Sequence, residues 1–253
     1  MTGQGGRKPA RSLFRRIIGA VLFAGLAALA VVAFLIADVT SYIYPTKSFA
    51  WNQRTIMQLD TPEGEVRFET VERVEVAYFG QTGGDALTGT EVRYRVEGQA
   101  AFVALPGGRV LFALRQGPGL AEGVYAVAEK NGRRERLRRI VAQAGEAPVP
   151  LERRLWPRFV AFEDLARPET VVILEPAAFE TALGAGYRLR AVLFQITDLP
   201  VTRPDLQAVL PWFEPVQGGH DRLCPPDGKP NDLPDCMRVR LRDFSAEIDH
   251  GVK

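Results

Sequence analysis

The spacing of hydrophobic residues changes once along this chain, close to its N-terminus. Residues 17–37 are apolar throughout, without a charged or strongly polar side chain. Beyond them apolar and polar positions alternate: in residues 66–78, Phe68, Val74 and Val76 share one parity and four of the five charged side chains take the other. A period of two is typical of an antiparallel strand with one buried and one wet face. The pattern predicts an apolar helix followed by a β-rich domain.

The remaining segments predict further strands and a few helices. Apolar or alternating runs predict strands at 56–60, 92–96, 124–128, 159–162, 171–174, 187–197 and 238–244. Apolar arms at 100–105 and 110–114, separated by Pro106–Arg109, predict a hairpin in the centre of a sheet. Helical spacing or capping signals predict helices at 133–144, 176–183 and 204–210. The expected fold class is α+β, mainly antiparallel β.

The apolar segment has the length of a transmembrane helix. As a helix, its 21 residues would cover about 30 Å, the thickness of the hydrocarbon core of a bilayer. Five basic residues and no acidic one precede it: Arg7, Lys8, Arg11, Arg15 and Arg16. Positively charged flanks stay in the cytoplasm, so the rest of the chain is expected to be exported. We predict a basic cytoplasmic tip (1–16), a transmembrane helix (17–37), a juxtamembrane linker (38–50) and a compact extracytoplasmic β-rich domain (51–253), with a subdivision near 145–157 as a variant.

A cleaved signal peptide is the alternative interpretation of the same segment. Ala28-Leu29-Ala30 has the small-x-small pattern of a cleavage site, and cleavage near Ala30 would give a secreted protein. The apolar run continues seven residues past Ala30, which favours an uncleaved signal anchor. Trp51, just after the linker, fits either an interfacial aromatic belt or the start of the domain core.

The net positive charge of the chain comes from its N-terminal segment. The whole chain of 253 residues is 46% hydrophobic and carries a formal net charge of +2. Without residues 1–37 it holds 27 basic and 30 acidic residues, a net charge of −3. The basicity therefore belongs to the cytoplasmic tip, and no nucleic-acid partner is indicated.

Cys224 and Cys236 are the only cysteines, and the residues between them include four prolines and a glycine, which is loop composition. In an oxidising compartment a pair this close predicts a disulfide bond. A ligand- or metal-binding module at this loop is the alternative, because His220 and several aspartates lie nearby. The spacing matches neither the usual zinc-ligand pairs nor a calcium-binding loop, so we predict no metal ligand and no cofactor.

Catalytic chemistry has few candidate residues. The histidines are His220, in a glycine-flanked loop beside Asp221, and His250, close to the C-terminal Lys253. No Gly-x-Ser-x-Gly motif supplies a nucleophile, and no phosphate-binding loop is present. The adjacent carboxylates Glu163 and Asp164 are not distinguished from the many other acids. We predict no catalytic residue.

A basic cluster is the clearest candidate interaction patch. Residues 129–158 hold nine basic and four acidic side chains, and five arginines fall within the predicted helix at 133–144: Arg133, Arg134, Arg136, Arg138 and Arg139. A basic amphipathic helix can bind an anionic membrane surface or an acidic partner. A helix that packs one stripe on the core and exposes its arginines to water is the alternative.

Several stretches together resemble one protein family: Ala86-Leu87-Thr88-Gly89, the hairpin from Leu105 to Leu114, Val160 to Val171, and Leu210-Pro211-Trp212. They are similar to a family of uncharacterised bacterial membrane-anchored proteins, each with an N-terminal membrane segment and an exported β-rich domain. The resemblance covers residues 51–213. It implies a bacterial inner-membrane protein with a cytoplasmic N-terminus and a periplasmic domain, and it assigns no catalytic residue.

The leading expectation is a single-span envelope protein whose external domain is a non-enzymatic interaction or accessory module. Its expected partners are the membrane, through one span, and another envelope protein or protein complex. A membrane-tethered hydrolase acting on envelope polymers, centred on His220 and nearby acids, is the alternative.

Overall fold

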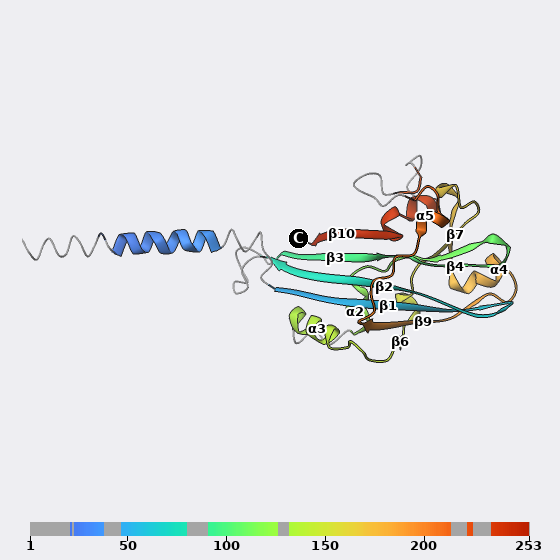
Figure 1. Cartoon of the computed structure of the whole chain (residues 1–253), viewed down its shortest axis with the longest axis horizontal. Coiled ribbons are helices and arrows are strands. Elements are labelled where there is room, and N and C mark those ends of the chain that lie inside the picture. The colour runs from blue at the N-terminus through green and yellow to red at the C-terminus, as the bar shows by residue number, and fades with distance from the viewer. Residues whose placement is uncertain are drawn as a thin grey trace, which may run out of the picture. The chain divides into compact units, whose positions relative to one another are not determined.

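The described residues of this computed structural model form one N-terminal helix and two β-sheets (Figure 1). They are Val21 and residues 23–37, 47–79, 91–125, 132–213, 222–224 and 234–252. The chain divides into two compact units, residues 1–47 with 78–91 and residues 48–77 with 92–253. The N-terminal helix and the β-rich domain are therefore described separately.

In the N-terminal unit, Val21 and residues 23–37 are helical. Their large apolar side chains are exposed, among them Phe23 at 75% and Leu29 at 68% of full accessibility. Within the described ranges, no helix combines the length and the apolar character needed to cross a bilayer. Residues 1–20, Leu22 and 38–46, which include the whole predicted tip and parts of the predicted span and linker, lie outside the described residues.

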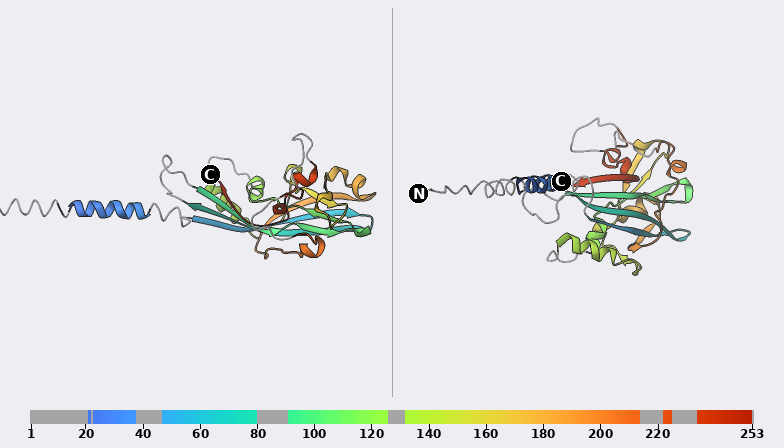
Figure 2. Two further views of the ribbon diagram at one scale, coloured as in Figure 1. Left: turned by 90° about the horizontal axis from the view of Figure 1, so that it is seen from above. Right: turned by 60° about the vertical axis from the view of Figure 1, so that its left-hand side comes forward.

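Sheet A is the larger of the two sheets and has six strands in the order β10-β3-β2-β1-β9-β6. The pairings β1–β9, β3–β10 and β6–β9 are antiparallel. Figure 2 shows its long strands side by side in two further views. The strands are β1 Lys47–Thr61, β2 Gly64–Phe79, β3 Glu91–Gln99, β6 Val149–Pro150, β9 Arg188–Thr197 and β10 Ser245–Val252.

The predicted strands of sheet A are confirmed, and the first one is longer than expected. Strand β1 begins at Lys47, inside the predicted linker 38–50, and Trp51 is only 4% exposed. The core interpretation of Trp51 is thus the correct one. The proline-rich segment 145–157 lies within one compact unit, where β6 pairs with β9.

Sheet B has four antiparallel strands in the order β4-β5-β7-β8, which are β4 Ala101–Ala104, β5 Val110–Ala113, β7 Phe159–Phe162 and β8 Val171–Leu174. The predicted hairpin is present as β4 and β5, joined through Gly107 and Gly108, both with positive φ. Its expected place in the centre of a sheet is wrong for β4, which is an edge strand. Phe102 and Val103 are correspondingly half-buried, whereas all four residues of β5 are buried.

Short helices cover the sheets: α2 Leu120–Val124, α3 Gly132–Val141, α4 Phe179–Leu183, α5 Leu206–Val209 and α6 Asp235–Arg238, with 3-10 turns η1 Pro106–Gly108, η3 Arg153–Leu155, η4 Pro168–Thr170, η5 Pro176–Ala178 and η6 Leu241–Asp243. Helix α2 lies on sheet A, because Tyr94 of β3 donates to Glu122 and the Tyr125 ring contacts Phe194 of β9. Sheet B carries an aromatic core in which the rings of Phe112, Phe162 and Phe244 meet within 6.1 Å.

Two local predictions are wrong. The strand expected at 124–128 is replaced at its start by the end of helix α2, and 126–128 lie outside the described residues. The segment expected as a strand at 238–244 begins with the last residue of helix α6 and continues into turn η6, and strand β10 comes after it. Val239 and Phe244 are both fully buried in the hydrophobic core of sheet B. They differ in parity, so a regular strand could not bury both on one face.

Candidate functional site

The predicted disulfide bond is present between Cys224 and Cys236. Leu223 donates its backbone N–H to the carbonyl oxygen of Cys236, so the two segments also pair through the backbone. Cys236 is 5% exposed and belongs to the aromatic core, together with Met237. The bond therefore ties residues 222–224 to the hydrophobic core of sheet B.

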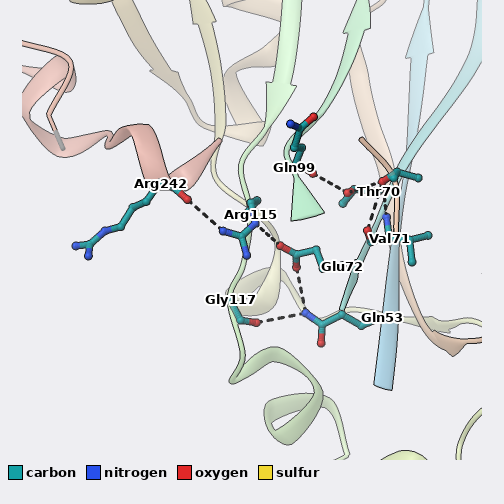
Figure 3. A network of polar contacts seen from close by, with 9 residues as sticks. Gln53, Thr70, Val71, Glu72, Gln99, Arg115, Gly117 and Arg242 are labelled. Atoms are coloured by element: carbon teal, nitrogen blue, oxygen red, sulfur yellow. Dashed lines mark hydrogen bonds and ion pairs between the residues drawn. The ribbon is translucent and has the colours of Figure 1, made fainter. Parts of the chain in front are cut away.

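A buried ion pair lies at the centre of the domain (Figure 3). The Arg115 Nε donates to Oε1 of Glu72 at 2.7 Å, and the two side chains are 5% and 2% exposed. Arg115 also donates from Nη1 to the carbonyl oxygen of Arg242 at 3.2 Å. The pair thus connects strand β2, the segment that follows β5, and turn η6.

The second carboxylate oxygen of Glu72 is used as well. Gln53 of β1, which is fully buried, donates from Nε2 to Oε2 of Glu72 at 3.1 Å and to the Gly117 carbonyl at 3.3 Å. Its amide oxygen accepts the indole N–H of Trp51. We define Trp51, Gln53, Glu72 and Arg115 as the polar core. Each of the charged groups in it has a hydrogen-bonding partner, as buried charges require.

The backbone around Glu72 has little room. A Cβ atom placed on Gly98 of β3 would lie 3.1 Å from both the Cα and the Cγ atoms of Glu72, and Gly98 has a φ of +148°. Beside it, the Thr70 hydroxyl donates to the carbonyl oxygen of Gln99 (Figure 3). The Thr202 hydroxyl accepts the backbone N–H of Val71. The glycine therefore permits β2 and β3 to approach at the polar core.

The polar core was missed by the sequence analysis, although one signal of it was present. Glu72 and Thr70 have the same parity as Phe68, Val74 and Val76, the predicted buried face of β2. A carboxylate at a buried position needs a partner, which indicates an internal ion pair. Its partner could not be identified, because Arg115 is 43 residues away.

The predicted arginine patch is on helix α3, which contains all five residues: Arg133, Arg134, Arg136, Arg138 and Arg139. The described side chains pair with acids at the surface. Arg136 lies 3.5 Å from Glu122 of α2, and Arg138 and Arg139 share Glu135 at 3.4 and 3.6 Å. The two exposed pairs with Glu135 contribute only about 0–1 kcal/mol each, whereas Glu122 is half-buried. Of the predicted apolar stripe, Leu137 and Ile140 are buried, whereas Val141 and Ala144 are exposed.

The candidate catalytic groups are not brought together among the described residues. His220 and Asp221 lie outside them, and His250 is placed by its backbone in β10. Glu163 and Asp164 are exposed, and Asp164 accepts the backbone N–H of Ala166 within a turn. In the described part of the chain, no group of three His, Cys, Asp or Glu residues could hold a metal ion.

One described aromatic group has a perturbed acidity. Burial, and secondarily the negative charge of Glu146, raises the pKa of Tyr125 above its ordinary value of 10.0. Its ring lies 6.0 Å from that of Phe194. Tyr125 is thus a packing residue at the end of α2 and stays protonated at neutral pH.

Comparison with known proteins gives no relative for this chain: no family profile, curated protein or solved structure matches it. The family resemblance drawn from the sequence stays a prediction.

Proposed function

We propose that this chain is a single-span protein of the bacterial envelope, anchored in the inner membrane by residues 17–37. Its β-rich domain lies on the periplasmic side and serves as a non-enzymatic interaction or accessory module. The proposal rests on the disulfide bond between Cys224 and Cys236. Structural disulfides persist in oxidising compartments and are rare in the cytosol.

The N-terminal sequence supports the same topology. Its five basic residues precede an apolar run of the length that a bilayer requires, and basic flanks are retained in the cytoplasm. The described part of that run is helical, with its apolar side chains exposed to the surroundings. A lipid environment would remove these side chains from water, at about 25 cal/mol for each Å² of apolar surface.

An interaction module is favoured over an enzyme by the way in which the described charged groups are used. The most deeply buried charges, Glu72 and Arg115, bind each other and hold three segments together. The carboxylates Glu163 and Asp164 are exposed in a turn, whereas acid–base catalysis requires groups that converge on a substrate. Among the described residues, the exposed charge without such a structural role is the basic surface of α3, which can bind an anionic membrane surface or an acidic partner.

Topology and oxidation can be tested together on the full chain in cells. Thiols are blocked with a maleimide of high mass before and after reduction, and spheroplasts are treated with a protease. We expect modification of Cys224 and Cys236 only after reduction, and digestion of the domain only once the outer membrane is opened. Free thiols without reduction, or a domain protected in spheroplasts, would contradict the proposed location.

The intact mass of the purified chain distinguishes the anchor from a cleaved signal. The anchor predicts a protein that retains residues 1–37 and resists extraction of membranes with alkaline carbonate. Cleavage near Ala30 would instead give a chain that begins at Val31 and is released from the membrane.

The interaction role is tested by cross-linking in native membranes. We expect the full chain to capture a defined envelope protein or complex, reproducibly and in fixed proportion. Substitution of all five arginines of α3 by glutamine tests whether the basic surface takes part. Repeated absence of any cross-linked partner would count against the interaction module, without affecting the topology.

A further inference from the structure

Helix α3 presents an exposed basic surface with little compensating negative charge. Arg138 and Arg139 are 61% and 43% exposed, and both are paired with a single carboxylate, Glu135. The helix sequence GRRERLRRIV contains five arginines and one glutamate. The helix sequence thus has a formal net charge of +4, and the sum stays positive when Glu122, which pairs with Arg136, is also counted.

Exposed apolar side chains accompany this basic surface. In the β-rich domain, the large hydrophobic side chains exposed at the described positions are Val141, at 37%, and Leu199, at 42%. Val141 is the last residue of α3. A basic surface with adjacent apolar groups is the composition that binds at the interface between lipid headgroups and acyl chains.

Both apolar residues lie at the same end of the β1–β9 strand pair. The segment after α3 is attached to β9, because Gly145 donates its N–H to the carbonyl oxygen of Ile196, the residue that pairs with Gln53 of β1. At the neighbouring position of β1, Asn52 donates from Nδ2 to the carbonyl oxygen of Leu199 at 2.8 Å. Figure 1 shows α3 beside this end of the sheet.

This end of β1 is also the one connected to the apolar segment. Only residues 38–46 separate Ala37 from Lys47, the first residue of β1. Even a fully extended connection of this length spans no more than about 35 Å. If residues 17–37 are in the bilayer, Lys47 cannot leave the neighbourhood of the membrane surface.

We propose that α3, with Val141 and Leu199, docks onto anionic lipid headgroups of the membrane that holds the apolar segment. The inference rests on the proposed anchor. A lipid surface is favoured over an acidic protein because the short tether keeps this end of the domain beside the membrane, and because the exposed groups are both cationic and apolar. Acidic phospholipids supply the complementary charge.

The expected strength follows from the charge. Each basic side chain near an anionic lipid surface favours the docked state by about fivefold, so replacing two arginines lowers the ratio of docked to undocked domain by about 25-fold. High salt lowers the same ratio, because it screens the attraction between exposed charges. Neither change affects the membrane span.

The test uses the full chain inserted into phosphatidylcholine vesicles with or without phosphatidylglycerol. An environment-sensitive fluorophore is attached at Ala142→Cys, an exposed position next to Val141, and the lipid headgroups carry a spin-label quencher. The matched position is Glu63→Cys, in the exposed turn at the opposite end of β1. We expect quenching at position 142 that depends on phosphatidylglycerol, and none at position 63.

Paired charge variants separate docking from folding and from insertion. R138Q/R139Q should abolish the quenching at position 142. R167Q/R188Q removes the same charge from exposed arginines elsewhere and should leave it unchanged; Arg188 pairs with Asp60 near the far end of β1. Equal quenching at positions 142 and 63, or quenching that is unaffected by R138Q/R139Q, would overturn the docking proposal. Failure of the anchor is distinct, because the chain then fails to float with the vesicles at all.

Discussion

Replacing Glu72 by glutamine tests whether the polar core holds the domain together. The substitution keeps the shape of the side chain and removes its negative charge. Arg115 would then remain 5% exposed, and the Arg242 carbonyl oxygen would still accept its Nη1 hydrogen bond. The cost is expected to come from an unpaired buried cation and not from lost packing.

The expected loss of unfolding free energy follows from the burial of the ion pair and from the distance between its charges. The nitrogen–oxygen distance is 2.7 Å, and both side chains are at least nine-tenths buried. Two unit charges about 4 Å apart attract by about 4 kcal/mol at an effective dielectric constant of about 20. Removing one partner of a buried pair typically costs about 3–5 kcal/mol. For a protein of this size the same loss lowers Tm by about 6–20 °C.

A matched surface pair provides the control. Arg154 and Glu152 are also 2.7 Å apart, but their side chains are 66% and 69% exposed. E152Q should therefore cost less than about 1 kcal/mol. Urea and thermal unfolding of the detergent-solubilised chain, followed by tryptophan fluorescence, measures both variants, with Trp51 inside the polar core as one reporter.

The outcome that would refute this reasoning is equal stability of E72Q and E152Q. A second check is the variant that combines E72Q with R115M. Because it removes both charges, it should be less destabilised than the sum of the two single variants. Strict additivity would mean that the two groups do not interact in the folded protein.

The remaining predictions concern the backbone near the polar core and the ionisation of one phenol. Gly98→Ala should destabilise the domain by about 1–3 kcal/mol in urea unfolding, because a Cβ would lie 3.1 Å from the Cα of Glu72; Gly119→Ala, with open space around it, is the near-neutral control. The raised pKa of Tyr125 means that the folded state holds the phenolic proton more tightly than the unfolded state. Stability should thus fall as the pH rises above about 10, and Tyr125→Phe should lose this part of the alkaline decrease; parallel curves for the two proteins would contradict the assignment.

Local patterns were enough to predict the long strands. In β2 and β3, apolar side chains alternate with charged ones, as expected for strands that bury one face. The burial of Val74, Val76 and Tyr94 therefore follows from their parity alone. The hairpin of sheet B followed from its proline and glycines. These elements are determined by residues that are near one another in sequence.

Partners far apart in sequence could not be predicted in the same way. Strand β10 pairs with β3 across more than a hundred residues, and its own sequence, SAEIDHGV, has little apolar alternation. The turn before it is fixed by Asp243, which accepts the backbone N–H of Arg240, and by the burial of Phe244. The arginine patch could be predicted from the composition of the segment. Its position beside the end of β1 could not, because it depends on hydrogen bonds between β9 and the residues that follow α3.

Helix α6 covers an edge of sheet B that could otherwise pair with another molecule. Strand β8 forms one border of sheet B, and an open border of this kind can recruit a strand from another molecule and start aggregation. The Asp235 carboxylate accepts the backbone N–H of Ile173 at 2.7 Å and so occupies a position that a foreign strand would use. Asp235 is the neighbour of Cys236 in α6, so the disulfide bond is attached to the helix that carries this carboxylate. The disulfide bond and the cover over the border of sheet B therefore meet in the same short helix, α6.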